Sequence, residues 1–454
     1  MKLRNFWLWI HRWGGLVIAV FLIIEGITGS IKAFDHEIGR LISPQLYPQP
    51  QPGKPQLDLA TLIERAQALM PPQGRAYTAL INPRTGRMEV GVMPPMPDMA
   101  AMKDKSMDTK AMEAMTASMP FQPFTLFLDP WTGQELGRRT YGAGKGSWTD
   151  GWAGVMTFIT ALHDRLALDG LGMIAGVVGH WTLGIIALLW TLDCFVSYYL
   201  TFPIGRRKEA SAAAQSKSWW SRWKPAWLIK TDASFYRLNF DLHRANGLWL
   251  WPLLFVFAWS SVMLNLKVVY EPVTKALFGY ERASTLQKAQ LEKFKTTEST
   301  LPNVREVLAT GLRVAQADGT KQGYTIMQPM GLMMPPNSSA AVLMLQTSRD
   351  EPGCEKFCGI MLMFDSKTGT VIDVTRPLQA TPNELTGNFI SRWLLKLHYG
   401  HPIGLWYQIV VCVVGIVIAM LSITGIYIWW KKRKARKHSE AKKAEAELAD
   451  DVET

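Results

Sequence analysis

The chain has 454 residues, of which 48% are hydrophobic and 19 are tryptophan, and its formal net charge is +12. The hydrophobic residues gather in four long segments, at 14–34, 171–202, 246–269 and 403–430. Each segment has the roughly 20 residues that cross a hydrocarbon core of about 30 Å. A soluble protein has little use for apolar helices of that length, so we predict an integral membrane protein.

The positive charge lies beside these segments. Lysine and arginine gather before the first segment, between the second and the third, and directly after the fourth. The positive-inside rule assigns such stretches to the cytoplasm, so both termini are expected there and the two long loops on the outer side. Basic runs next to anionic lipid act as topology signals. The charge therefore predicts the lipid bilayer, and not nucleic acid, as the partner.

The first half is expected to contain a spanning helix, an outward region and a second spanning helix. We assign these to residues 1–34, 35–170 and 171–202, followed by a cytoplasmic loop at 203–242. Within the outward region, residues 58–66 have helical apolar spacing with Asp58 as a cap. Alternating residues predict strands at 77–81, 88–92 and 124–128. The last strand runs into the turn sequence Asp129-Pro130-Trp131-Thr132-Gly133.

The second half repeats this plan. A third spanning helix is expected at 243–269, a second outward region at 270–400, a fourth spanning helix at 401–430 and a cytoplasmic tail at 431–454. The outward region is predicted to contain a helix from Asn303 and strands at 323–327, 340–345 and 359–364, and then the turn sequence 365–369. The fold class is thus a duplicated bundle of four transmembrane α-helices with two outward α+β modules, related by an axis along the membrane normal.

A methionine-rich insertion occupies residues 93–119 and has no counterpart of its size in the second half. It contains Met93, Met96, Met99 and Met102 among others. Thioether sulfur suits soft metals such as Cu(I), although methionine is also a flexible filler. Cys354 and Cys358 lie in the second outward region, where either a small disulfide, free thiols or a weak metal site would fit.

Four histidines stand next to the apolar segments in two matched pairs. His11 and His243 are expected to begin helices on the cytoplasmic side, whereas His163 and His398 precede helices that begin on the outer side. Titratable groups at membrane depth are costly and usually functional. A six-coordinate haem takes two axial imidazoles, and facing helices of a bundle can hold it. Two imidazoles at each face therefore predict two haems, with interfacial anchoring as the alternative.

Several neighbouring residues leave alternatives open. His401 lies three residues after His398 and is an alternative ligand, and His180, inside the second helix, is either a ligand or a buried histidine. Arg12 and Arg244 follow their histidines directly, and either pair with haem propionates or snorkel as membrane anchors. Glu25, deep in the first helix, either balances haem charge or makes a local polar contact.

These motifs together resemble one family. His11-Arg12-Trp13, Leu162-His163, Leu242-His243-Arg244, Leu397-His398 and the two Asp-x-x-Thr-Gly turns occur in the order of the PepSY-associated transmembrane family, over about residues 5–430. The family includes bacterial inner-membrane siderophore reductases, among which the ferrioxamine reductases carry two b-type haems on four helices. The resemblance implies two haem b, His11, His163, His243 and His398 as their ligands, periplasmic PepSY-like modules and an inner-membrane location.

This sequence departs from the family pattern at two points. The third helix ends in Ser260-Ser261 without the Thr-Gly pair found at Thr28-Gly29 and Thr424-Gly425, and the methionine-rich insertion is not expected. These departures leave the scaffold intact and bear on the substrate.

The predicted function is that of an oxidoreductase, an inner-membrane di-haem b-type reductase. It would pass electrons from the cytoplasmic side to a periplasmic ferric siderophore or other ferric chelate and so aid iron release. No dinucleotide or flavin fingerprint occurs in the cytoplasmic stretches, so a separate donor protein or a quinol is expected. The alternatives are a PepSY-type binding or regulatory protein, and a copper-handling protein that uses the methionines.

Overall fold

The computed structural model describes residues 2–82, 85–95, 119–140, 151–171, 173–203, 218–281, 292–294, 303–335, 338–350, 359–375, 384–400 and 403–453. The chain divides into two compact units. The helical unit consists of Met1–Ser30, Trp181–Lys267 and Ile409–Thr454. The sheet unit consists of Ile31–His180 and Val268–Gln408.

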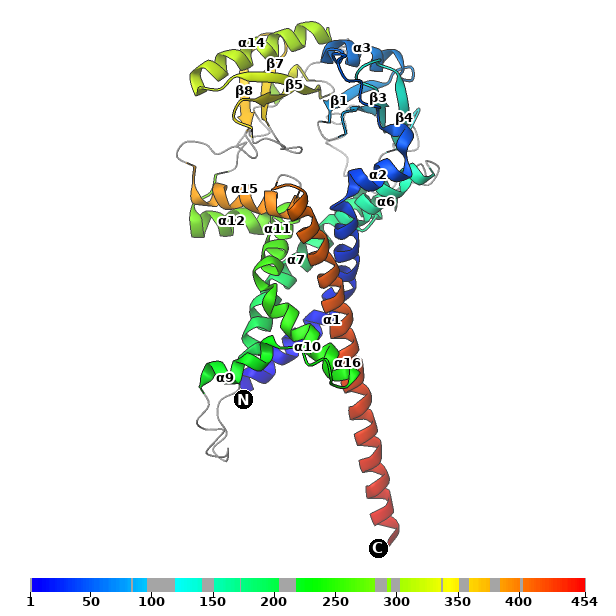
Figure 1. Cartoon of the computed structure of the whole chain (residues 1–454), viewed down its shortest axis with the longest axis vertical. Coiled ribbons are helices and arrows are strands. Elements are labelled where there is room, and N and C mark those ends of the chain that lie inside the picture. Colours follow the sequence, from blue (N-terminus) through cyan, green and yellow to red (C-terminus); the bar gives the residue numbers. More distant parts are fainter. Residues whose placement is uncertain are drawn as a thin grey trace. The chain divides into compact units, whose positions relative to one another are not determined.

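The helical unit is built from long apolar helices (Figure 1). They are α1 (Lys2–Lys32), α7 (Met173–Thr201), α10 (Phe235–Trp249), α11 (Trp251–Asn265) and α16 (Leu405–Glu453), with the short α9 (Trp219–Trp223) and η3 (Lys224–Trp227) between α7 and α10. Among the described residues, α1, α7 and α16 contain stretches long and apolar enough to cross a membrane. The pair α10 and α11 passes the same criterion together, which brings the number of spans to as many as four.

The third apolar segment differs from the single helix expected at 243–269. It forms two helices, α10 and α11, whose axes are bent by 72° at a break around Leu250. Pro252 lies in the first turn of α11, where its missing N–H costs nothing, whereas inside a continuous helix it would remove a hydrogen bond and clash with the preceding turn. The fourth segment also differs, because α16 continues through the expected tail to Glu453.

Small residues bring α1 and α16 close together. A Cβ atom at Gly26 would overlap the backbone at Gly415, and a Cβ atom at Gly415 would overlap Ser30. The Ser30 hydroxyl lies 2.8 Å from the carbonyl oxygen of Cys412 and 2.8 Å from that of Gly26. Helices in lipid associate through such close backbone approach at small side chains, so these glycines fix the packing of the first helix on the last.

The sheet unit contains one antiparallel sheet with the strand order β4-β3-β2-β1-β5-β6-β7-β8. The strands are β1 (Arg75–Ile81), β2 (Met88–Met93), β3 (Phe124–Leu128), β4 (Glu135–Thr140), β5 (Ile326–Met333), β6 (Ala340–Thr347), β7 (Ile360–Asp365) and β8 (Val371–Thr375). The order of one helix followed by four strands occurs twice, with α3 (Leu59–Ala68) before β1 and α14 (Val304–Gln322) before β5. Pairing of β1 with β5, as at Thr78 and Met333, joins the two sets into a single sheet.

The strand predictions are largely confirmed, with two omissions and one shift. β4 and β8 are not predicted, because their exposed and half-buried residues carry no apolar alternation. β5 starts at Ile326 and not at 323, because α14 continues to Gln322 and Gly323 ends it with a left-handed φ of 72°. The cap at Asp58 is confirmed, since its carboxylate accepts a hydrogen bond from the Thr61 N–H at 3.0 Å.

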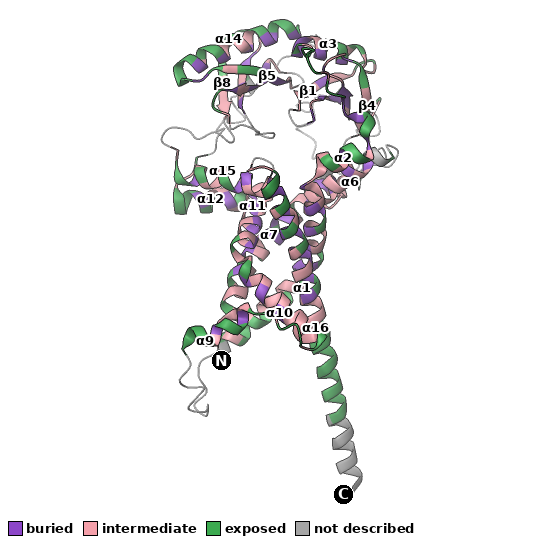
Figure 2. Ribbon diagram, in the orientation of Figure 1, coloured by how far each residue is buried: buried purple, intermediate pink, exposed green. Residues whose placement is uncertain are grey.

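The main hydrophobic core of the sheet unit lies between the two helices α3 and α14 and one face of the sheet (Figure 2). The turn sequences after β3 and β7 close on themselves, because the N–H of Gly133 bonds to the carbonyl of Asp129 at 2.7 Å and that of Gly369 to Asp365 at 2.8 Å. Both glycines have a positive φ, of 70° and 75°, which a residue with a Cβ adopts only at a cost.

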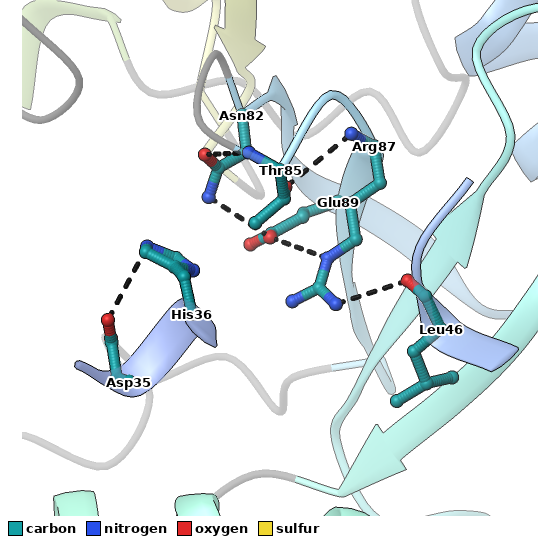
Figure 3. A network of polar contacts seen from close by, with 7 residues as sticks. All are labelled: Asp35, His36, Leu46, Asn82, Thr85, Arg87 and Glu89. Carbon is teal, nitrogen blue, oxygen red and sulfur yellow. Dashed lines mark hydrogen bonds and ion pairs between the residues drawn. The ribbon is translucent and has the colours of Figure 1, made fainter. Parts of the chain in front are cut away.

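The remaining helices of the sheet unit are α2 (Asp35–Ile42), η1 (Pro44–Leu46), α6 (Trp152–Arg165), η2 (Leu168–Leu171), α12 (Lys267–Phe278), η4 (Glu292–Phe294) and α15 (Thr386–Tyr399). Arg87 links η1 to the sheet through hydrogen bonds (Figure 3). Its guanidinium donates to the Leu46 carbonyl at 3.1 Å and to Glu89 at 2.9 Å, and lies 4.1 Å from the ring centre of Phe127. A buried arginine is tolerated because each of these contacts compensates lost hydration.

Candidate cofactor site

Two of the four histidines meet inside the helical unit. His11 lies on α1 and His243 on α10, and their ring centroids are 6.2 Å apart with an interplanar angle of 54°. Neither histidine begins its helix as expected, because α1 starts at Lys2 and α10 at Phe235. The expectation placed each helix start at the onset of the apolar run, whereas helical hydrogen bonding begins earlier, in the more polar residues before it.

Each of these histidines has one ring nitrogen bonded to the protein. His11 Nδ1 donates to the Asp193 carboxylate on α7 at 2.9 Å. His243 Nδ1 donates to the carbonyl of Leu421 on α16 at 2.9 Å and lies 3.1 Å from the Thr424 hydroxyl. Metal-binding histidines typically hold their second nitrogen in this way, which fixes the tautomer and the ring orientation. The Nε2 atom of both rings is then the nitrogen available to a ligand.

The sequence motifs predict neither the contact of Asp193 with His11 nor the contacts of the Thr424-Gly425 pair with His243. The only signal for Asp193 is an acidic residue within an apolar segment, where such residues are usually functional. The role of Gly425 is steric, since a Cβ atom there would lie 3.2 Å from His243 Cε1. The pair thus supplies a polar contact to the imidazole and room for its ring.

Both rings line a cavity of about 320 Å³ within the helical unit. Its walls are largely apolar, and its polar lining includes His11, His243, Asp193, Arg12, Arg244 and Lys432. A mostly apolar pocket with a few convergent polar groups is the usual form of a cofactor site.

His11 and His243 are the residues that would hold the iron of a haem in this cavity. A ring nitrogen binds a first-row metal at about 2 Å, so two rings on opposite sides of one iron have centroids about 6 Å apart. The observed 6.2 Å matches this spacing. Among the described residues no group of three or more His, Cys, Asp or Glu side chains could hold a bare metal ion. A pair of imidazoles instead suits haem, whose porphyrin supplies the other iron ligands.

The cations that line the cavity include Arg12, Arg244 and Lys432. The guanidinium of Arg244 donates to Asp241 at 2.8 Å and to the Pro225 carbonyl at 2.5 Å. Asp241 is fully buried and also accepts from Arg237, so Arg244 balances a buried charge. Lys432 is a cation that the sequence motifs do not single out. Arg12 and Lys432 are therefore the better candidates for propionate partners.

The other two histidines lie in the sheet unit, on helices that end before the apolar segments begin. His163 lies on α6, which stops at Arg165 before Leu166 and Ala167 adopt positive φ values. His398 lies on α15, which stops at Tyr399 before Gly400. These interruptions separate α6 from α7 and α15 from α16. His163 and His398 therefore do not lie on the apolar helices that follow them in the sequence.

Two charged residues act on His398, namely Lys32 and Asp164, and Asp164 directly follows His163 in the sequence. Asp164 forms an ion pair with Lys32 at 2.8 Å. Burial, together with the nearby Lys32, lowers the pKa of His398 to about 4, against the opposing influence of Asp164. The imidazole is consequently neutral near pH 7, which is the form that binds metals.

The remaining predicted residues are less informative. His180 lies half-buried in the first part of α7, and Glu25 lies half-buried within α1. Met93 is the last residue of β2. His401, Met96, Met99, Met102, Cys354 and Cys358 lie outside the described residues.

Apolar helices of spanning length, an antiparallel sheet and facing imidazoles in an apolar pocket define an integral membrane protein with a candidate cofactor site. A family model for the PepSY-associated TM region matches residues 8–432, and the chain belongs to this family. No curated protein matches the chain.

Proposed function

We propose that this membrane protein is a di-haem b-type reductase. In this proposal it lies in a bacterial inner membrane with both termini in the cytoplasm, and passes electrons from the cytoplasmic side to a ferric siderophore or other ferric chelate in the periplasm. Reduction of ferric iron weakens the hold of a chelator on the metal and so aids its release.

The observation that carries the proposal is the arrangement of His11 and His243. Their rings are spaced for a shared iron, both Nδ1 atoms are engaged, and both rings line one apolar cavity. A haem held in this cavity would be a one-electron carrier within the helical unit. Membership of a family defined over residues 8–432 supports a function that uses the whole chain.

The protein groups around this pair have separable roles. Asp193 accepts the Nδ1 proton of His11 and increases the basicity of that imidazole. The Leu421 carbonyl holds His243 in the corresponding tautomer without adding a charge. Arg12 and Lys432 provide positive charge for the carboxylates of a cofactor, and the apolar walls exclude water from the site.

His163 and His398 are the proposed ligands of the second haem. Support comes from the burial of His398, which lowers the pKa of its imidazole, and from Asp164, the residue after His163, which acts electrostatically on His398. His401 and His180 remain the alternative ligands for this site. The cytoplasmic stretches of the sequence carry no dinucleotide or flavin fingerprint, and the proposal therefore includes a separate cytoplasmic donor protein or a quinol.

The first test is haem content of the purified full-length protein. Pyridine haemochrome analysis should give two haem b per chain, and low-temperature electron paramagnetic resonance should give low-spin signals typical of bis-histidine ligation. The dithionite-reduced protein, mixed anaerobically with ferrioxamine or ferric citrate, should then be reoxidised as ferrous iron appears in a ferrozine assay. A protein that binds no haem when produced with ample haem would contradict the proposal. A haem-loaded protein that no ferric chelate reoxidises would limit its function to another acceptor.

A further inference from the structure

The two faces of the second set of strands, β5 to β8, differ in their chemistry. The face toward the core is aliphatic and aromatic, with Leu332, Leu343, Leu345, Ile360, Leu362 and Phe364 all at most 1% exposed. Side chains alternate between faces along a strand. The residues between them therefore point to the opposite face, and four of these are methionines, namely Met333, Met344, Met361 and Met363.

The strand register brings these four methionines together. Met344 on β6 is directly opposite Met361 on β7, and Met363 follows two residues later on the same side of β7. Val342 is opposite Met363 on one side and Met333 on the other. Directly opposed Cβ atoms lie about 5 Å apart and diagonal ones about 7–8 Å. The sulfur atoms of Met344, Met361 and Met363 can therefore converge over strands β6 and β7.

All four methionines are half-buried, and so remain accessible from outside the core. The helices α3 and α14 contribute to the core on the other face. A face that only had to be apolar could be built from leucine and valine, as the core face is. On β6 and β7 every methionine lies on the accessible face, although Met330 of β5 is buried. This placement points to the sulfur atoms, because thioethers are ligands for soft monovalent metals.

The methionine-rich stretch of the sequence begins at the same end of the sheet. Met93 lies on the same face as Met333, because Val90 and Val92 of β2 alternate with it into the core. It is paired with Arg75 at the start of β1. The last residues of β5 lie at this end too, since the Met334 N–H bonds to the Tyr77 carbonyl at 3.0 Å.

We propose that Met344, Met361 and Met363, with Met333 beside them on the same face, form a thioether site for a soft monovalent cation, Cu(I), on the accessible face of the sheet. The site needs no haem and no electron transfer, so it stands or falls separately from the proposed reductase function. Carboxylates and imidazoles are not required, which distinguishes it from sites for zinc or ferrous iron.

The test uses Ag(I) as a redox-inactive substitute for Cu(I) and the full-length protein in detergent. Methionine oxidation by a mild oxidant such as chloramine-T is followed residue by residue by mass spectrometry, with and without Ag(I). We expect Ag(I) to slow oxidation of Met344, Met361 and Met363. Oxidation of Met327, which is 64% exposed on β5 and stands four residues before the partner of Met344, should be unchanged.

A matched pair of variants gives a second measurement. The triple substitution Met344→Leu, Met361→Leu and Met363→Leu conserves apolar volume, and Met327→Leu is its control. The triple variant should bind Ag(I) at this site at least about tenfold more weakly, since even outer groups of a metal site typically contribute that much. The control should bind like the unmodified chain, and Zn(II) should protect none of the methionines.

Oxidation of the three methionines at the same rate with and without Ag(I) would overturn the proposal, and so would equal protection of Met327. The first outcome would leave these residues as an apolar contact surface for another protein segment. The oxidation measurement on the unmodified chain decides the question even if the triple variant does not fold.

Discussion

The pair His11 and His243 and the pair His163 and His398 stand at similar points of the sequence, each just before a long apolar segment, yet their surroundings differ. The first pair lies in the helical unit, where its rings line an apolar cavity and have defined hydrogen-bond partners. The second pair lies in the sheet unit, near the ends of the helices α6 and α15 and next to an ion pair.

The comparison shows that repeated motifs do not imply equal sites. The first pair is held by groups on α7 and α16, so four helices of one unit determine its geometry. The second pair depends on where α6 and α15 lie within the sheet unit. We therefore expect the first site to be the more rigid one and the second to respond more strongly to changes around it.

The largest expected effect is the loss of the first haem. His243→Ala should remove one of two haems, because a single imidazole no longer provides both axial ligands. Haem content and the low-spin resonance signal measure this loss. Added imidazole should restore binding by filling the space of the missing ring. His36→Ala, which changes a histidine of α2 in the sheet unit, is the control and should retain both haems.

The ligands of the second haem are tested by the same haem-content measurement, on variants of four candidate histidines. His163→Ala and His398→Ala should each remove the other haem and leave the first one spectroscopically unchanged. His401→Ala and His180→Ala should leave both haems in place. If His401→Ala abolishes the second haem while His398→Ala does not, the assignment of the outer ligand passes to His401.

A smaller effect is expected from the group behind His11. Asp193→Asn removes a negative charge but keeps a hydrogen-bond acceptor near Nδ1. Loss of such a partner typically weakens metal binding about 10- to 100-fold. The reduction potential of the first haem should also rise, because a less basic imidazole stabilises ferric iron less. Redox titration measures this shift, and an unchanged potential would show that Asp193 does not act on the ligand.

The smallest effect is expected at Thr424. Thr424→Val removes the hydroxyl 3.1 Å from His243 Nδ1, but the Leu421 carbonyl still accepts the bond. A neutral hydrogen bond contributes about 1 kcal/mol, so haem affinity should fall less than tenfold. Haem dissociation to apomyoglobin measures the change. An effect as large as that of Asp193→Asn would mean that the two histidines are held in equivalent ways.

Local sequence was sufficient for much of the fold. Alternating residues predicted the core strands, the cap at Asp58 was read correctly, and the turns at Asp129 and Asp365 followed from their glycines. These features depend on neighbouring residues alone. β4 and β8 are the edge strands of the sheet, and their residues are exposed or half-buried on both faces, so their sequences carry no apolar alternation to detect.

Hydrophobic segments and the order of motifs alone indicate a membrane protein of the PepSY-associated family and single out His11 and His243 as candidate ligands. Only the tertiary structure decided that Asp193 lies behind His11, that Lys432 joins Arg12 at the cavity, and that β1 pairs with β5 in one sheet. Hydrophobic period and turn chemistry are properties of adjacent residues. Contacts between distant residues, such as His11 and Asp193, which are 182 positions apart, depend on how the helices pack.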